Sequence, residues 1–156
     1  MNRRVAISIA ALLLLFSGRL LTLGSDRTPA QLEAEIDRES NPKKRLKLAV
    51  ELTDARLKDV LSAYDAEDHG KEGESIEHYI SGLDRLEKAV KDVPHGGLSK
   101  ESEIHLREQA HALEDLKRSV SFNERASVEK VAMRVTKLHE VILGGIMNPN
   151  KERAKP

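Results

Sequence analysis

The sequence predicts an all-α protein: an antiparallel up-down four-helix bundle, preceded by a short helix and an N-terminal signal or anchor segment. Aromatic residues make up only 3% of the 156 residues, and β-branched residues are sparse, which disfavours a β-sandwich or a barrel. Apolar residues recur at three- and four-residue steps along four stretches of about 20–25 residues each. Short linkers separate these stretches, which favours antiparallel neighbours.

Residues 1–24 have the layout of a secretory signal peptide. Arg3 and Arg4 form a basic start, an apolar run covers residues 5–16, and small residues then lead to a plausible cleavage point after Gly24. The protein is therefore predicted to be exported, either to the periplasm or to the medium.

An uncleaved membrane anchor is the alternative interpretation of the same segment. Residues 5–24 are about long enough to cross a bilayer. Arg19 lies within that span and disfavours a central position in the membrane. We expect any contact with a membrane to be made by this segment alone.

The formal net charge of zero combines two unequal parts. Without residues 1–24 the chain keeps 23 basic and 26 acidic residues, a net charge of −3, and all six histidines. A slightly acidic exported chain with few aromatic residues is not expected to bind nucleic acid. The absence of cysteine excludes disulfides, thiol nucleophiles, cysteine-ligated metals and a lipidated N-terminal cysteine.

Residues 25–41 are predicted to form a short helix and a linker. Thr28 and Gln31 are spaced for a capping box, with proline in the first turn, and the helix should end before Pro42 because the residue before proline avoids the α region. The apolar stripe of this helix consists of Leu32 and Ile36.

The helical bundle is predicted to span residues 42–145. The second helix of the chain, which is the first of the bundle, begins at Asn41-Pro42. It has a wide apolar stripe, typical of a face buried between two neighbours. Residues 65–73 are polar and contain two glycines, which predicts a turn, so the third helix is expected over residues 74–93. The two stripes comprise Leu46, Val50, Thr53, Leu57, Val60 and Tyr64, and then Ile76, Ile80, Leu83, Leu86, Val90 and Val93.

Two further helices complete the predicted bundle. Ser99 is a cap residue for the fourth, and the spacing of Ser121 and Glu124 predicts a capping box for the fifth. Gly144-Gly145 is expected to end the fifth helix, and residues 146–156 are predicted to form a disordered tail. The stripes of these helices comprise Leu106, Ala110, Leu113, Leu116 and Val120, and then Val128, Val131, Val135, Leu138 and Ile142. An extended pair of hairpins that dimerises is the main alternative to a closed bundle.

One group of side chains has a spacing compatible with metal binding. Glu101, His105 and Glu108 follow one another at steps of four and three, which places them on one helix face. They could bind Zn²⁺ or Ni²⁺ weakly, with Glu74 and His78 of the preceding helix as additional ligands. A solvated polar face is the simpler interpretation of the same pattern.

No motif points to an enzyme or to a resident cofactor. The chain lacks GxSxG, SxxK, HExxH and GxxxxGK[ST]. Glu108-x-x-His111 is a single Glu-x-x-His motif, whereas a ferritin-like di-metal bundle needs two. Haem is disfavoured because Met133 and Met147 lie close together in sequence, near His139.

A resemblance covers residues 45–89. The stretches RLKLAVELTDARLKDV (residues 45–60) and YISGLDRLEKA (residues 79–89) resemble an uncharacterised helical domain of exported, membrane-linked bacterial proteins. The resemblance implies an extracytoplasmic helical protein of the bacterial envelope, and it carries no catalytic residues.

These observations lead to a functional hypothesis and two alternatives. The first is a non-catalytic exported bundle that acts as an envelope adaptor or structural interaction protein, with another envelope protein or a second copy of itself as the partner. The second is an envelope metal-binding or stress-sensing protein that uses His and Glu side chains on helix faces. The third is a protein that binds a small ligand or haem in the bundle core.

Overall fold

The computed structural model of the protein describes residues 27–94 and 97–148. In these ranges the structure is all-α, with five helices and no strand, as predicted. The predicted signal or anchor segment, residues 1–24, and residues 149–156 of the predicted tail lie outside the described residues. The helices are α1 (Pro29–Arg38), α2 (Pro42–Asp65), α3 (His69–Asp92), α4 (Lys100–Ser119) and α5 (Phe122–Met147).

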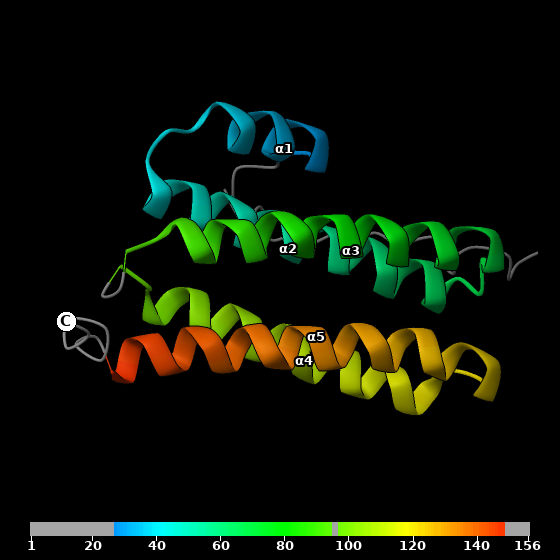
Figure 1. The fold of residues 1–156 in the computed structure, drawn as a ribbon. Helices are drawn as coiled ribbons and strands as arrows, with labels where there is room; N and C mark the ends of the chain where they lie inside the picture. Colours follow the sequence, from blue (N-terminus) through cyan, green and yellow to red (C-terminus); the bar gives the residue numbers. More distant parts are fainter. Residues whose placement is uncertain (1–26, 95–96, 149–156) are drawn as a thin grey trace, which may run out of the picture.

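The four long helices form two antiparallel hairpins, α2 with α3 and α4 with α5, packed against each other (Figure 1). Between the hairpins, α2 contacts α4 and α3 contacts α5, and these pairs run in the same direction. Lys47 near the start of α2 faces Glu101 near the start of α4, and His69 at the start of α3 faces Glu124 at the start of α5. Antiparallel packing therefore holds within each hairpin but not between the contacting helices of different hairpins.

The predicted apolar stripes form one continuous core between the hairpins. Leu52, Leu83, Leu106 and Val135 are completely buried within it, and all five predicted stripe residues of α5 are buried. The two hairpins therefore share a core, which favours the closed arrangement over the extended one. Among the helices of the described residues, none is both long and apolar enough to cross a membrane.

The predicted helix starts are confirmed at α1, α2 and α4. Thr28 and Gln31 form the expected capping box, and the side chain of Asn41 accepts hydrogen bonds from the backbone N–H groups of Lys43 and Lys44. Ser99 Oγ accepts from the backbone N–H of Ser102, 3.1 Å away. These caps supply partners for backbone N–H groups that have none inside the helix.

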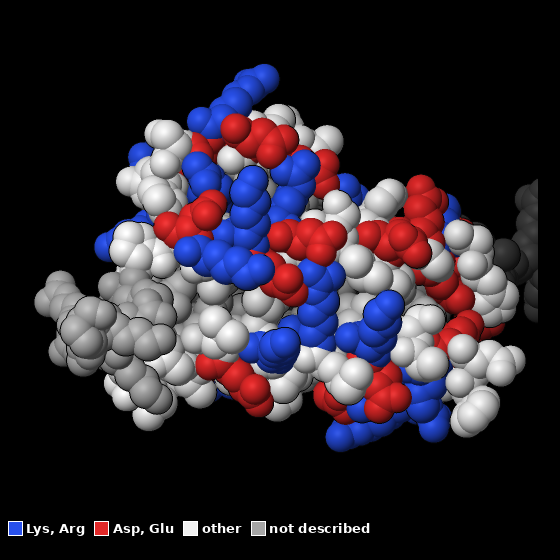
Figure 2. Space-filling view, in the orientation of Figure 1, with Lys and Arg blue, Asp and Glu red and all other residues white. Residues whose placement is uncertain are grey.

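The short helix α1 runs alongside α2 on the outside of the first hairpin (Figure 1). Leu32 and Ile36 are buried beneath it, as predicted. Arg56 of α2 pairs with Glu33 at 3.1 Å, and Arg85 of α3 pairs with Asp37. Figure 2 shows Lys and Arg side chains interspersed with Asp and Glu over this face, in keeping with the zero net charge of the chain.

The predicted start of the third helix at residue 74 is wrong. α3 begins five residues earlier, at His69, because Asp68 caps it: its side chain accepts a hydrogen bond from the backbone N–H of Lys71, 3.2 Å away. Glu67 makes the reversal before it with a φ of 52°, in the left-handed region. The two glycines that indicated a turn lie inside the first turns of α3.

The predicted end of the fifth helix at Gly144-Gly145 is also wrong, because α5 continues to Met147. A glycine costs a helix about 1 kcal/mol relative to alanine, which packing can offset. Here Leu98 packs onto the bare backbone: a Cβ at Gly145 would lie 2.5 Å from Cδ1 of Leu98, so a side chain at this position would displace the end of the Leu98 side chain. Gly145 therefore lets Leu98 pack closely against the last turns of α5.

Candidate functional site

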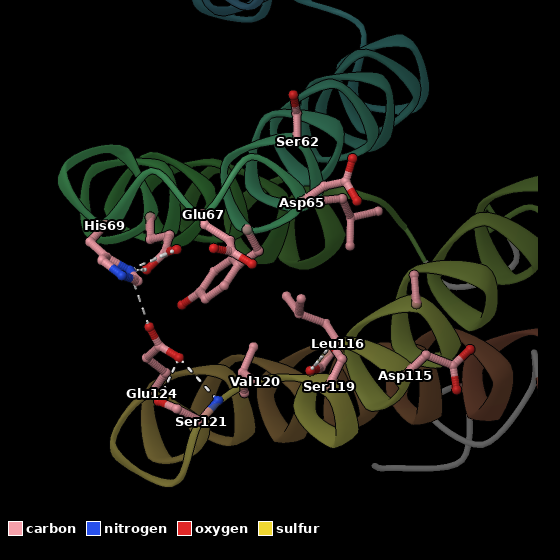
Figure 3. A pocket seen from close by; sticks show the side chains of 14 residues that line it. Ser62, Asp65, Glu67, His69, Asp115, Leu116, Ser119, Val120, Ser121 and Glu124 are labelled. Carbon is pink, nitrogen blue, oxygen red and sulfur yellow. Dashed lines mark hydrogen bonds and ion pairs between the residues drawn. The ribbon is translucent and has the colours of Figure 1, made fainter.

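A cleft of about 1050 Å³ opens between the two hairpins, at the end where α2 turns into α3 and α4 turns into α5 (Figure 3). We call it the junction cleft. Its lining contains one imidazole, that of His69, and five carboxylates, but no lysine or arginine. The chain as a whole has equal numbers of acidic and basic residues, so the cleft concentrates negative charge. The five acidic residues are Asp65, Glu67, Glu72, Asp115 and Glu124.

The early start of α3 determines where two side chains of the cleft lie, those of His69 and Glu72. Because the helix begins at His69, His69 and Glu72 are three residues apart in its first turn and share a face. Glu72 is only 6% exposed, whereas the His69 side chain is 80% exposed. The first turn of α3 therefore places a buried carboxylate beside an accessible imidazole.

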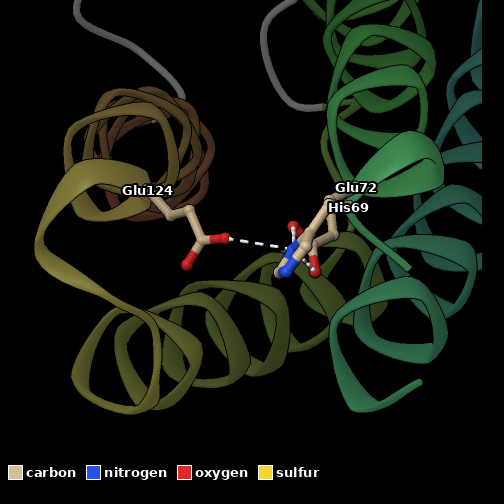
Figure 4. Close-up of side chains that lie close together, drawn as sticks. All are labelled: His69, Glu72 and Glu124. Carbon is tan, nitrogen blue, oxygen red and sulfur yellow. Dashed lines mark hydrogen bonds and ion pairs between the residues drawn. The ribbon is translucent and has the colours of Figure 1, made fainter. Parts of the chain in front are cut away.

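Glu124 approaches these residues from the other hairpin. It lies in the first turn of α5, where its Oε2 accepts hydrogen bonds from Ser121, at 3.1 Å from the backbone N and 2.6 Å from Oγ. This is the predicted capping interaction. Its Oε1 faces His69 instead, 3.7 Å from Nδ1 (Figure 4). One oxygen therefore caps the helix, and the other points into the cleft.

His69, Glu72 and Glu124, which we call the junction cluster, bring one nitrogen and two carboxylates together. His69 Nδ1 lies 3.0 Å and 3.2 Å from the two carboxylate oxygens of Glu72. One ligand atom from each residue can be chosen so that all three lie within 4.8 Å of one another. In the described parts of the chain, this is the one set of three or more His, Asp or Glu residues that meets this criterion.

The electrostatics of the cleft agree with this geometry. The hydrogen bond with Glu72 raises the pKa of His69, and the charges of Glu72 and Glu124 add to that effect. Burial raises the pKa of the Tyr64 hydroxyl in the lining, reinforced by the same two carboxylates. The hydrogen bonds from Ser121 hold the pKa of Glu124 below its usual range. The cluster therefore presents a negative charge towards the cleft.

The metal-ligand set predicted from sequence occupies a different place, on α4. His105 Nδ1 lies 2.8 Å from Oδ2 of Asp54 on α2, and Glu101 lies 3.8 Å from Nζ of Lys47. Glu108 is exposed. These three residues share a helix face, but the structure does not bring their ligand atoms within 4.8 Å of one another.

The two additional ligands suggested for that set lie elsewhere again. Glu74 and His78 line a recess of about 340 Å³ between α2 and α3, to which α4 contributes no residue. His105 lines a third recess, between the first turns of α2 and α4. The structure therefore does not join Glu74 or His78 to His105.

Sequence reasoning missed the junction cluster because residues 65–73 were interpreted as a turn. A signal was present in the apolar spacing. Ile76, Tyr79 and Leu83 are buried at three- and four-residue steps, and one more step of four towards the N-terminus leads to Glu72. Asp68, a preferred N-cap type, stands four residues before it. Glu124 was identified only as a cap, and its proximity to α3 depends on how the hairpins pack.

A second polar cluster, the central network, lies in the middle of the bundle. The Tyr79 hydroxyl donates to Oε1 of Gln109, 2.7 Å away, and Gln109 Nε2 donates to Thr53 Oγ1 at 2.9 Å and to Asp54 Oδ1 at 2.6 Å. Tyr79, Thr53 and Gln109 are at most 1% exposed. Burial raises the pKa of the Tyr79 hydroxyl, which keeps it protonated as a donor.

Comparison with known proteins adds no relative. No family model, no curated protein and no solved structure matches this chain. The resemblance of residues 45–89 to a helical domain of exported bacterial proteins therefore stays a prediction.

Proposed function

We propose that this protein is exported to the bacterial envelope, where it acts without catalysis as an adaptor or structural interaction protein, through the outward face of α5. The observation that carries the proposal is the position of exposed apolar side chains. All four large hydrophobic side chains that are exposed in the described residues belong to α5. They are Phe122 (84% exposed), Met133 (63%), Val141 (50%) and Met147 (70%).

Three of these side chains share one side of the helix. Phe122 and Met133 are separated by eleven residues and Met133 and Met147 by fourteen, which are close to three and four turns at 3.6 residues per turn. This side lies opposite the stripe that α5 buries in the core. The three side chains stand about 16 and 21 Å apart along the helix, so they do not form one continuous patch. Single exposed hydrophobic residues are ordinary, and it is the alignment of these three on one side of α5 that favours a contact surface.

The partner that best fits this face is a second copy of the chain. In an antiparallel pair of α5 helices centred on Met133, Glu129 comes opposite Lys137 of the second copy, so the charges are complementary at both symmetric positions. Phe122 comes opposite Gly144, where a Cβ would meet no atom within 4 Å, which leaves room for the ring.

The test is the mass of the full chain in solution, measured by size-exclusion chromatography with light scattering. We expect a dimer that Glu129→Lys or Lys137→Glu weakens at least about tenfold, and that the double charge reversal restores. Glu77→Lys, on an exposed part of α3, is the matched control and should leave the dimer intact.

Two outcomes would decide against the second copy. A strict monomer at every concentration rejects self-association, and a dimer insensitive to both charge reversals rejects the α5 pairing. Site-specific crosslinking from Met133 to another envelope protein would retain the interaction function with a different partner.

Divalent-metal binding is the second candidate function. The observation that favours it is the junction cluster rather than Glu101, His105 and Glu108.

A further inference from the structure

We propose that His69, Glu72 and Glu124 bind one divalent first-row transition metal ion, with Zn²⁺ as the preferred probe. The ion would connect the two hairpins at the end of the bundle that holds the junction cleft. His69 and Glu72 come from α3, and Glu124 comes from α5. The site is independent of the α5 contact surface, so either proposal can fail without the other.

The donor atoms suit this class of ion. An imidazole nitrogen with carboxylate oxygens is a common Zn²⁺ donor set, whereas Ca²⁺ and Mg²⁺ prefer oxygen donors alone. Ligands about 2.1 Å from a tetrahedral ion lie about 3.4 Å apart. His69 Nδ1 lies 3.0 Å from Glu72 Oε2 and 3.7 Å from Glu124 Oε1. One of these distances is slightly shorter than the separation expected around an ion, and the other is slightly longer.

The oxygens are also available for coordination. Glu124 uses Oε2 for its bonds with Ser121, which fixes the carboxylate while leaving Oε1 directed at His69 (Figure 4). Glu72 contacts His69 through both oxygens, and no Lys or Arg forms a salt bridge with it in the described part of the chain. Three protein ligands leave at least one position for water, as in open zinc sites.

A second buried glutamate in the same protein provides a matched comparison. Glu103 is 8% exposed and, like Glu72, contacts a histidine: its Oε1 lies 2.8 Å from Nε2 of His139. Arg107 lies 3.8 Å from the same carboxylate and supplies positive charge. At Glu72 the third group is another carboxylate, that of Glu124. The Glu103 cluster is thus charge-balanced internally, whereas the junction cluster has an excess of negative charge.

The surrounding cleft adds an independent argument for a cation. Besides Glu72 and Glu124, its lining holds Asp65, Glu67 and Asp115, with no Lys or Arg (Figure 3). Asp115 is paired with Arg118 at 3.3 Å, just outside the lining, so Asp65 and Glu67 supply most of the additional negative charge. A concave surface lined by charges of one sign raises the local concentration of the opposite ion. The cleft therefore favours cations at the point where the imidazole selects for a transition metal.

The experiment is isothermal titration of the metal-free full chain with Zn²⁺, together with Co²⁺ absorption as a report on the ligand set. We expect one ion per chain, bound more tightly than about 1 mM. Each of His69→Asn, Glu72→Gln and Glu124→Gln should weaken binding at least about tenfold. Glu124→Gln is informative because glutamine preserves a helix-capping side chain while removing the charge.

Matched controls separate ligation from general loss of structure. Glu103→Gln changes the other buried glutamate, and His78→Asn changes an exposed histidine; both should retain Zn²⁺ binding. Zn²⁺ should also raise the thermal midpoint of the wild-type chain but not that of Glu72→Gln, measured by circular dichroism. Circular dichroism spectra of every variant, recorded in the same way, report whether that variant is folded.

Three results would overturn the proposal. The first is no binding of Zn²⁺, Ni²⁺ or Co²⁺ tighter than about 1 mM. The second is binding that survives all three junction variants. The third is binding lost in His105→Asn but kept in His69→Asn, which would assign the metal to the α4 residues Glu101, His105 and Glu108 instead.

Discussion

Two polar clusters connect the hairpins of this protein, and they are built in opposite ways. In the central network, Tyr79, Gln109 and Thr53 are excluded from solvent. The Tyr79 hydroxyl donates to one acceptor within the protein, and the amide nitrogen of Gln109 donates to two. In the junction cluster, Glu72 is also buried, at 6% exposed, but its neighbours are an exposed imidazole and a second carboxylate.

Burial of polar groups does not by itself identify a site. The central network satisfies its own hydrogen bonds, so it can specify how the hairpins align without any ligand. The junction cluster combines several acceptors with few donors, and a cation from outside would balance it. The ratio of donors to acceptors, rather than burial, distinguishes the two clusters.

The largest expected effect comes from removing the residue on which the central network depends. Gln109→Ala deletes the partner of Tyr79 and Thr53 and leaves a cavity, so we expect the free energy of unfolding to fall by about 3 kcal/mol. Chemical denaturation of the full chain measures it. A loss below about 0.5 kcal/mol would mean that the network contributes nothing to hairpin docking.

Removing a single hydroxyl from the same network should have a smaller effect. Tyr79→Phe keeps the ring in the core but leaves Oε1 of Gln109 without its donor, which should cost about 1–2 kcal/mol in the same denaturation experiment. An increase in stability would contradict the assignment of Tyr79 as a required donor.

The junction cluster should respond differently. In metal-free buffer Glu72→Gln removes one of two neighbouring carboxylates while preserving the shape of the side chain, so stability should change by less than about 1 kcal/mol. Metal binding, not stability, should be the property that this variant loses. If it instead destabilises the metal-free chain as much as Gln109→Ala does, the contrast between the clusters is wrong.

The smallest effect concerns a third contact between the hairpins, in which an arginine side chain supplies the positive charge. Arg134 of α5 lies 2.6 Å from Glu87 on α3, and this hydrogen bond holds the pKa of Glu87 below its usual value of 4.5. A lowered pKa in the folded state stabilises the protein above the unfolded-state pKa, and that contribution disappears as the pH falls through the folded-state pKa.

The corresponding measurement compares wild type with Glu87→Gln across pH. The variant should be less stable by about 0.2–1 kcal/mol near neutral pH, as for other partly exposed ion pairs. This difference should shrink as the pH falls below 4.5. A difference that grows on acidification would show that the ion pair does not stabilise hairpin docking.

Local features of the fold could be predicted from the sequence. The Thr28–Gln31 capping box, the start of α2 at Pro42 and the buried stripe of α5 depend on residues close together in the chain, where spacing alone determines the geometry. The two errors, at His69 and at Met147, arose where glycines were interpreted as breaks, although capping or tertiary packing kept the helix intact.

The site could not be predicted in the same way, because it depends on the packing of one hairpin on another. Glu72 and Glu124 are 52 positions apart, and only the parallel alignment of α3 with α5 brings them together. The predicted set on α4 satisfied the helical spacing rule, but the structure does not bring its three ligand atoms within 4.8 Å of one another. Spacing within one helix therefore identified candidate ligands without identifying a site.

The hairpin arrangement also has a consequence for how the chain folds. Contacts within each hairpin join segments adjacent in sequence, whereas contacts between hairpins close a much longer loop. Because loop closure precedes the gain from distant contacts, the hairpins should form early and their docking should come last. The residues that unite the hairpins, Gln109 among them, should then influence the unfolding rate more than the refolding rate.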